Sequence, residues 1–182
     1  MKKLFAFAMA LAICLTAFAV PSAFAATFTA EGVYTVTYDD AAYTVDTTTY
    51  ADENVDDTYH WYGLIYNNDY AIDATVYDVE DLAGVTLFTM EELERQEYVD
   101  YMMDAHSDSD IDYIGSLTVS EYGIPFYFFT AEDSEGEYLF AQTLVQGKAI
   151  DFAIYYNDAS MDVDQTLVDA LSELVNTFVP AI

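Results

Sequence analysis

The stretch between residues 111 and 178 constrains the fold most strongly, because the spacing of its apolar residues changes from that of strands to that of a helix. Apolar residues at every second position are typical of a strand with one buried face. They recur in this way in two segments, first as Ile111, Tyr113, Leu117 and Val119, and later as Ile150, Phe152, Ile154 and Tyr156. The pattern predicts a strand in each segment.

Two turns divide this stretch, and a helix follows them. The acidic segment 133–137 separates residues 126–131 from residues 138–145, which predicts a hairpin. Gln146-Gly147-Lys148 is predicted to form the next turn. Beyond the last strand, the apolar residues follow helical spacing on one side: Leu167, Leu171, Leu174, Val175 and Phe178. This spacing predicts a helix that covers the sheet.

Two further hairpins are predicted earlier in the chain. In the first, residues 33–38 alternate, Asp39-Asp40 forms a turn, and residues 43–45 return alongside. In the second, residues 59–79 form two strands joined by a turn at Asn67-Asn68-Asp69. Both hairpins are expected to contribute strands to the same fold.

A second helix is predicted between the hairpins and the final stretch. Thr89-Met90-Glu91-Glu92 has the form of a capping box, so a helix is expected from there to about Ala105. Its predicted buried residues are Met90, Leu93, Tyr101, Met102 and Ala105. The order of elements predicts an α+β fold, with a mainly antiparallel sheet covered by two helices.

This order of elements resembles the PsbP-like fold, the family of the extrinsic photosystem subunit and its exported bacterial relatives. The resemblance depends most on the final strand and helix, from Ile150-Asp151-Phe152-Ala153-Ile154-Tyr155-Tyr156 to Asn176-Thr177-Phe178. It implies an α/β/α sandwich formed by one domain over residues 26–182. It transfers no binding site, because the chain has no residue motif specific enough for that. The acidity and the tyrosine content also differ from those of the photosystem subunit, which argues against a photosynthetic role.

Residues 1–25 are predicted to be a signal peptide. Lys2 and Lys3 precede an apolar run, and Ala23-Phe24-Ala25 has the small-x-small pattern that a signal peptidase cleaves. The alternative is an uncleaved membrane anchor, because the run is nearly long enough to span a bilayer. Cys14 lies within the apolar run and lacks the small preceding residue of a lipidation site. The protein is therefore expected to be secreted or to reside in the cell envelope, without a lipid.

The charge of the remaining chain excludes some partners. Residues 26–182 keep two basic residues, Arg95 and Lys148, against 33 acidic ones, so the net charge is −31. Such a charge repels nucleic acid phosphates and anionic lipids. It is also expected to raise the pKa of many carboxyl groups on folding, through repulsion between like charges. The protein is expected to be a monomer. Its expected partner is cationic or sugar-bearing.

Polar side chains, most of them carboxylates, stand at every second position in two runs, Asp104-His106-Asp108-Asp110-Asp112 and Asp158-Ser160-Asp162-Asp164. Calcium takes several oxygen ligands on a flexible loop, and alternate residues can direct carboxylates to one point. Asp108, Asp110 and Asp112 are the candidate calcium ligands. Neither run has the glycine that an EF-hand loop requires, so the favoured interpretation is a solvated helix end for the first run. For the second it is a helix cap at Asp162, with Gln165 reaching back.

Catalytic motifs are absent from the sequence. It has no Gly-x-Ser-x-Gly, no His-Glu-x-x-His and no Walker loop. Its only cysteine lies in the predicted signal peptide, and its only imidazoles are His60 and His106. With 33 acidic residues, carboxylate pairs suited to glycoside hydrolysis arise by chance. A non-enzymatic binding domain without a cofactor is expected, with an extracellular hydrolase or a passive acidic protein as the alternatives.

The 17 tyrosines allow a further interpretation. Tyr59, Trp61 and Tyr62 lie in one predicted strand and Tyr155-Tyr156 in another, so both faces of the sheet carry aromatic rings. Such rings can stack on sugars or hold a peptide at a wet interface. The favoured interpretation is strand propensity together with a core covered by helices.

Overall fold

The computed structural model describes residues 25–49, 59–105, 110–119, 122–134 and 136–181. The strands are β1 (Ala26–Ala30), β2 (Tyr34–Tyr38), β3 (Thr44–Asp46), β4 (Tyr59–Tyr66), β5 (Tyr70–Asp78), β6 (Asp110–Val119), β7 (Ile124–Asp133), β8 (Gly136–Val145), β9 (Lys148–Tyr156) and β10 (Val179–Pro180). The helices are the short 3₁₀ helices η1 (Glu80–Leu82) and η2 (Leu87–Thr89) and the α-helices α2 (Glu92–Ala105) and α3 (Gln165–Val175). None of the helices in these ranges is long and apolar enough to span a bilayer.

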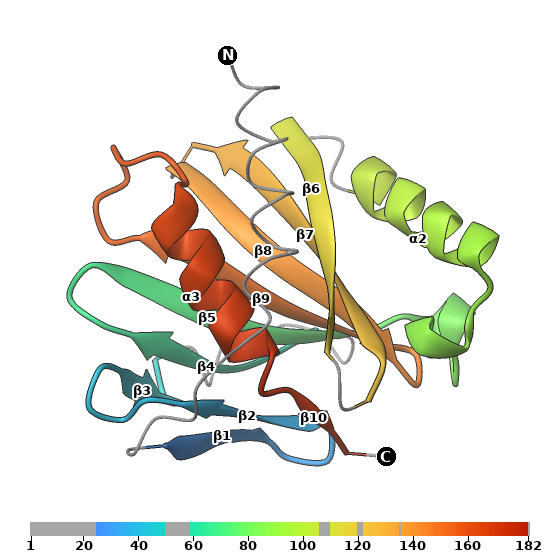
Figure 1. The fold of residues 1–182 in the computed structure, drawn as a ribbon, viewed down its shortest axis with the longest axis horizontal. Helices are drawn as coiled ribbons and strands as arrows, with labels where there is room; N and C mark the ends of the chain where they lie inside the picture. The colour runs from blue at the N-terminus through green and yellow to red at the C-terminus, as the bar shows by residue number, and fades with distance from the viewer. Residues whose placement is uncertain (1–24, 50–58, 106–109, 120–121, 135, 182) are drawn as a thin grey trace.

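Seven strands form one antiparallel sheet in the order β3-β4-β5-β9-β8-β7-β6 (Figure 1). The predicted α+β fold with a mainly antiparallel sheet is confirmed. The hairpins at Asn67-Asn68-Asp69 and at residues 133–137 also form as predicted. Strand β9 pairs with both β5 and β8, so it joins the early hairpin to the final meander.

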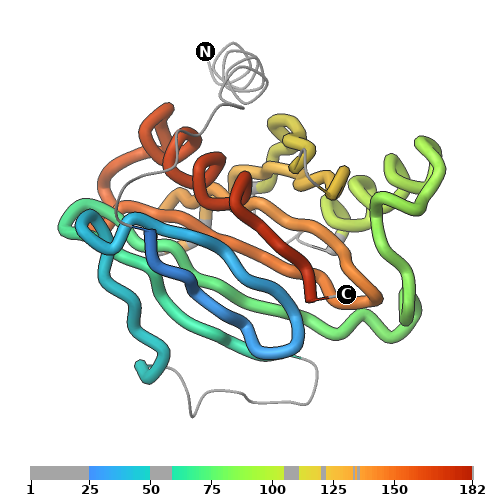
Figure 2. The backbone as a smooth tube through the Cα atoms, turned by 60° about the horizontal axis from the view of Figure 1, so that its bottom comes forward, coloured from blue at the N-terminus to red at the C-terminus, as the bar shows by residue number. Residues whose placement is uncertain are grey.

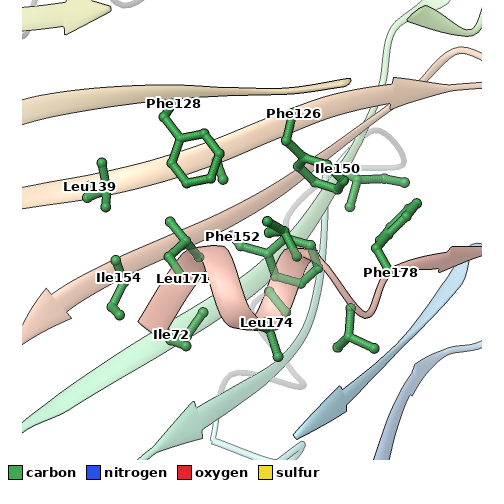
Figure 3. Close-up of a cluster of buried hydrophobic side chains, with 14 of the residues drawn as sticks. Ile72, Phe126, Phe128, Leu139, Ile150, Phe152, Ile154, Leu171, Leu174 and Phe178 are labelled. Carbon is green, nitrogen blue, oxygen red and sulfur yellow. The ribbon is translucent and has the colours of Figure 1, made fainter. Parts of the chain in front are cut away.

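Alternate residues of the strands build a core on each face of the sheet. On one face, Ile150, Phe152 and Ile154 pack with Leu171 and Leu174 of α3, which crosses the strands (Figure 3). On the other face, Phe129 and Phe140 stack with their ring centroids 5.0 Å apart. There they pack with three buried residues of α2, Tyr98, Val99 and Met102. The two helices therefore cover opposite faces, as the predicted sandwich requires.

A bulge in β6 changes which residues that strand buries. Tyr113 pairs with Phe129 and Gly115 pairs with Phe128, so Ile114 is an additional residue in the ladder. Such a residue reverses the alternation beyond it. Tyr113 is consequently 41% exposed on the face of α2, whereas Ile114 and Leu117 belong to the core under α3. The predicted single buried face of residues 111–119 is therefore wrong: Ile111 and Tyr113 lie on the face of α2, whereas Leu117 and Val119 lie in the core under α3.

The first predicted hairpin is also wrong. Strand β2 pairs with β1 over five residue pairs, whereas β3 pairs with β4 in the large sheet. The turn at Asp39 does form, because the amides of Ala42 and Tyr43 donate to the Asp39 carbonyl, but it directs the chain from one sheet to the other. The alternation in the sequence predicts a strand only from residue 33 onward, so β1 is not predicted.

Strands β1, β2 and β10 form a second, small sheet that brings the two ends of the described chain together (Figure 2). The Thr177 hydroxyl accepts from the Thr37 amide at 2.7 Å and donates to the Thr37 carbonyl at 3.0 Å. Phe28 of β1 approaches so closely that a Cβ on Gly63 would lie 2.7 Å from its ring. Glycine in the bulge of β4 therefore allows the small sheet to pack against the large one.

The turn between β8 and β9 depends on its glycine. Gln146 and Gly147 have φ values of 54° and 80°, the left-handed region that two-residue hairpin turns of this kind require. A Cβ at Gly147 would lie 2.8 Å from the Leu82 carbonyl oxygen. The predicted turn is confirmed, and its glycine also lets the η1 segment pack against it.

Helix α2 buries only part of the predicted set: Met102 is buried and Met90 packs against the same cluster, but the other side chains differ. Leu93 is 71% exposed and Tyr101 is 54% exposed, while Tyr98 and Val99 are buried. The side of the helix that carries Tyr98 and Met102 packs against Phe129 and Phe140, so the opposite side faces solvent. The predicted capping box does not form either: the Thr89 hydroxyl donates to the Thr86 carbonyl, and Glu94 accepts from the Glu91 amide.

Candidate functional site

The candidate calcium ligands fall at a gap in the described chain. Asp108 lies outside the described residues, as does His106 of the same run. Asp110 begins β6 but its side chain is not described, and Asp112 is exposed on that strand. Among the described residues, no three His, Cys, Asp or Glu side chains are grouped closely enough to hold a metal ion. The proposed calcium triad therefore stays a prediction.

The second run of acids forms turns and a helix cap. Asp158 accepts from the amide and the hydroxyl of Ser160 at 3.1 and 2.7 Å, and these bonds lower the pKa of Asp158. The cap of α3 is Asp164, which accepts from the Thr166 amide at 2.8 Å. The predicted cap at Asp162 is wrong by two residues. Gln165 donates to Asp169 instead of reaching back.

Asp164 also accepts a hydrogen bond from the Tyr156 hydroxyl, at 2.8 Å. Partial burial raises the pKa of Asp164, but the bonds from Tyr156 and Thr166 outweigh it, so this pKa is lowered. The carboxylate therefore stays charged at the N-terminus of α3, where the helix dipole favours a negative charge. The same bond fixes the ring of Tyr156 at the end of β9.

A pocket of about 460 Å³ lies at this end of the sheet. Its walls come from the β4–β5 turn and from the segment between β9 and α3, and its lining residues are Asn68, Asp69, Tyr70, Tyr156, Asn157, Asp158, Met161 and Thr166. Asp69 and Asp158 are both exposed, and no lysine or arginine is among the lining residues. The pocket thus presents carboxylates and aromatic rings without a neutralising cation of its own.

Asn157 holds the two walls together. Its side-chain amide donates to the carbonyl oxygens of Asn67 and Asn68 at 3.2 and 3.0 Å, and its backbone amide donates to the Asp69 carbonyl at 2.9 Å. The Asn67 side chain in turn accepts from the amides of Asp69 and Tyr70. These bonds fix the shape of the turn before any ligand arrives, which lowers the entropy cost of binding.

Two tyrosines at the pocket are held by contacts behind them. The rings of Tyr70 and Tyr156 meet edge to face with centroids 6.5 Å apart. The Tyr70 hydroxyl lies 2.7 Å from the Tyr43 hydroxyl, and burial raises the pKa of Tyr43 well above its usual value. Burial also raises the pKa of Tyr156, so its hydroxyl stays protonated at physiological pH. The rings of Tyr70 and Tyr156 can offer a π face to a cation or a sugar.

A separate polar cluster lies beneath α2. Asp151 of β9 is 8% exposed and points to the face that α2 covers, where Gln142 of β8 and Thr75 of β5 are its register partners. Burial raises the pKa of Asp151 to about 7, and a hydrogen bond from Gln142 opposes this increase. Within the described part of the chain, one carboxyl oxygen of Asp151 has no hydrogen-bond partner. The Tyr98 hydroxyl donates to the Gln142 side-chain oxygen at 2.5 Å.

Asp73 provides a third polar centre on the same face of the sheet. Its two carboxylate oxygens accept from Trp61 Nε1 and from the Tyr155 hydroxyl, each at 2.9 Å. The aromatic residues predicted to line this face thus fix a carboxylate in place. His60 is half-buried on the other face, next to Tyr62, which fits a packing role rather than a basic one.

Neither the pocket nor the buried carboxyl group is predicted from the sequence, for different reasons. The pocket needs Asn67 and Asn157 at one edge of the sheet, and only the pairing of β5 with β9 puts them there. Asp151 did carry a signal, because it is a charged residue between Ile150 and Phe152 in an apolar strand. That position lies on the opposite face of the sheet, and the sequence pattern does not predict that this face is buried so completely.

Comparison with known proteins identifies the fold. No family model matches the chain, and no curated protein matches its sequence. The solution structure of cyanobacterial PsbP (CyanoP) from Synechocystis sp. PCC 6803 is similar to it, with a TM-score of 0.50 and 11% identity over 90% of this chain and 96% of that one. The PsbP-like fold expected from the order of elements is confirmed. At this identity the similarity concerns the fold alone.

Proposed function

We propose that this chain is an exported, non-enzymatic binding domain whose pocket between the β4–β5 turn and the β9–α3 segment takes a cationic ligand. The observation that carries the proposal is the composition of that pocket. Asp69 and Asp158 stand beside Tyr70 and Tyr156, and no basic side chain is among the lining residues. A cation would gain attraction from both carboxylates and from the tyrosine rings.

The lining favours an organic cation over a bare metal ion. Asp158 already accepts two hydrogen bonds from Ser160, and the carbonyls of Asn67 and Asn68 accept from Asn157. Few oxygen atoms are left to replace the water shell of calcium, which takes six to eight ligands. Met161, which is 45% exposed, adds apolar surface suited to the carbon chain of an amine. Calcium assistance through Asp108, Asp110 and Asp112 remains a separate proposal.

The setting proposed for this function is the cell envelope or the extracellular space. The support is the predicted signal peptide at residues 1–25 and the net charge of −31 beyond it. That charge would concentrate small cations near the surface and keep the monomers apart. It would also exclude nucleic acids and anionic membranes as partners.

The hydrolase alternative is less well supported than binding. A general acid needs a carboxyl group whose pKa is raised towards neutrality. At the pocket, Asp158 has a lowered pKa. Among the described carboxyl groups, Asp151 is the one with a raised pKa, and it is buried beneath α2 and not among the lining residues.

The test is a titration of the exported protein with spermidine, a flexible trivalent amine, followed by calorimetry. The pocket variant combines Asp69→Asn and Asp158→Asn, because asparagine keeps the size of aspartate and can preserve the Ser160 turn. The matched control combines Glu80→Gln and Asp81→Asn, which removes the same charge from the exposed helix η1. The pocket variant should lose about tenfold in affinity, a change of about 1.4 kcal/mol, and the control much less.

Three other results would contradict the proposal. An equal loss in both variants would mean that amines bind the diffuse charge of the surface. Absence of saturable binding would leave a passive acidic protein. Saturable binding of a neutral oligosaccharide that the pocket variant retains would assign the pocket to sugars, because its tyrosines and amides would then be sufficient.

A further inference from the structure

Helix α2 buries one apolar side against the sheet and exposes two large apolar residues on its other side. Tyr98, Val99 and Met102 are buried against Phe129 and Phe140. On the opposite side of the helix, Leu93 and Tyr101 are 71% and 54% exposed. Large exposed apolar side chains rimmed by polar residues often mark a protein–protein interaction site. Leu93 is the most exposed of the large apolar residues in the described part of the chain.

The two exposed apolar residues lie on one stripe with acidic residues. At 3.6 residues per turn, positions 93, 97, 100, 101 and 104 share a side of the helix. This outer stripe consists of Leu93, Glu97, Asp100, Tyr101 and Asp104, all of them exposed. Leu93 and Tyr101 are about 12 Å apart along the helix axis. Asp100 accepts one hydrogen bond, from Gln96, and Arg95 lies on the other side of the helix, half-buried.

We propose that the outer stripe of α2 is a docking surface for a basic, amphipathic helical segment of a partner protein. Apolar side chains of the partner would cover Leu93 and Tyr101, and its lysines or arginines would pair with Glu97, Asp100 and Asp104. Figure 1 shows α2 at the edge of the molecule, with its outer side turned away from the sheet. A segment of about 14 residues would match the length of the helix.

Charge excludes the other occupants of an apolar helix face. A second copy of this chain would bring another net charge of −31 against the three acids of the stripe. Anionic lipid would be repelled in the same way. A neutral apolar partner would leave these carboxylates desolvated without counter-charges, which costs free energy. A basic partner is the occupant whose charge complements the stripe, and electrostatic attraction would also speed its association.

This surface is distinct from the pocket of the proposed function. The pocket is lined by the β4–β5 turn and the β9–α3 segment, and no residue of α2 is among its lining residues. Either site can therefore exist without the other, and variants can separate them.

The experiment measures binding of a labelled 14-residue Lys/Leu amphipathic peptide to the full exported chain by fluorescence anisotropy. Its control is a scrambled peptide of the same composition, which has the same charge but no apolar face. The helix variant combines Leu93→Gln and Tyr101→Gln, because glutamine is a good helix former and both sites are exposed. The matched protein control is Met161→Gln, which removes an apolar residue of similar exposure from the pocket.

The amphipathic peptide should bind at least about tenfold more tightly than the scrambled one. The helix variant should lose that preference, and Met161→Gln should keep it. A charge variant, Glu97→Gln with Asp100→Asn, should weaken binding of the peptide and reduce its dependence on salt. Circular dichroism melts of each variant confirm that the helix is retained.

Two outcomes would overturn the inference. Equal binding of the two peptides to the unchanged protein would show attraction by charge alone. Loss of binding in Met161→Gln, with the helix variant unaffected, would show that the peptide enters the pocket. Neither outcome depends on spermidine binding, so failure of this inference and failure of the proposed function are distinguishable.

Discussion

The Tyr98 hydroxyl on α2 donates a hydrogen bond to the Gln142 side-chain oxygen on β8, and both residues are buried. Gln142 also bonds to the Asp151 carboxyl group on the neighbouring strand. One amide side chain thus joins a helix to a buried carboxyl group in the sheet. Around it the contacts are mostly apolar, so this link gives helix α2 a defined position on the face that it covers.

Tyr98→Phe should destabilise the protein by about 1–3 kcal/mol, because it leaves the buried oxygen of Gln142 without its donor. The ring of Tyr98 is retained, so packing against Tyr127 changes little. Urea denaturation measures the loss. Relative to the unchanged protein, amide hydrogen exchange in the variant should accelerate most in α2, because the link from this helix to the sheet is lost.

The control for that variant is Tyr101→Phe on the same helix. Tyr101 is 54% exposed, and removal of its hydroxyl should change the free energy of unfolding by no more than about 0.5 kcal/mol. If the two variants have equal stability, the buried link between α2 and β8 does not contribute as the structure indicates.

The cap of α3 gives a second test, with two aspartates two positions apart. Asp164→Ala should cost about 0.5–2 kcal/mol, because the Thr166 amide loses its acceptor. Asp162→Ala, at the exposed position that the sequence favoured as the cap, should have an effect near zero. Thermal denaturation of both variants decides which residue caps the helix; a larger loss at Asp162 would contradict the assignment.

The elements that the sequence predicted correctly are those with local signals. The hairpins at Asn67-Asn68-Asp69 and at Gln146-Gly147 carry their own turn residues, and α3 carries a single apolar side. Helix α2 lacks such a signal, because its apolar residues lie on two opposite sides. The side that is buried depends on Phe129 and Phe140, which are distant in sequence.

The errors in strand pairing and in the candidate site have a related cause. Strand β2 lies between β1 and β3 in sequence and could pair with either of them. Because β3 pairs with β4, the partner of β2 is β1. The bulge at Ile114 likewise depends on the register with β7. The two walls of the pocket meet through long-range pairing, as in the bond from Asn157 to Asn67, and residue spacing alone does not define that pairing.

Leu171→Ala should cost about 2–5 kcal/mol, because the fully buried side chain would leave a cavity between α3 and the sheet. Leu93→Ala is the matched control, since this leucine is 71% exposed and its loss should cost about 0.5 kcal/mol or less. Urea denaturation of both variants measures the difference. Equal and small effects would mean that α3 does not cover the core.

Asp151 should make stability depend on pH. Its pKa is about 7 in the folded protein, against about 3.9 for an unperturbed aspartate. The native state therefore binds the proton more tightly than the unfolded state does. The stabilisation is fully present below about pH 4, is lost progressively as the pH rises to about 7, and stays lost above that value. At about 1.4 kcal/mol per pKa unit, the total is on the order of 4 kcal/mol at most.

Other carboxyl groups act in a different pH range. Hydrogen bonds lower the pKa of Asp46 to about 2, and local hydrogen bonds also leave Asp158 and Asp164 with lowered pKa values. Their stabilisation is present above about pH 4 and is lost as the pH falls through the folded pKa values. Like-charge repulsion is therefore not the dominant cause of the three lowered pKa values or of the raised pKa of Asp151, contrary to the expectation from the net charge. Stability should be greatest near pH 4–5, between the two effects.

Asp151→Asn separates the contribution of this carboxyl group from that of the surface charges. Asparagine is neutral at every pH and keeps the size of the protonated acid, so the variant should match the unchanged protein below about pH 4 and exceed its stability increasingly as the pH rises to about 8. The nearby Tyr98 and Tyr77 stay neutral over this range, because burial raises the pKa of both.

The matched control, Asp169→Asn on the solvent side of α3, should keep the full pH dependence. Urea denaturation at low and high salt measures both variants, and salt should have little effect on the part due to Asp151, which is shielded from ions. An unchanged slope between about pH 4 and pH 7 in Asp151→Asn would mean that repulsion among surface carboxylates, not this buried group, controls the pH response.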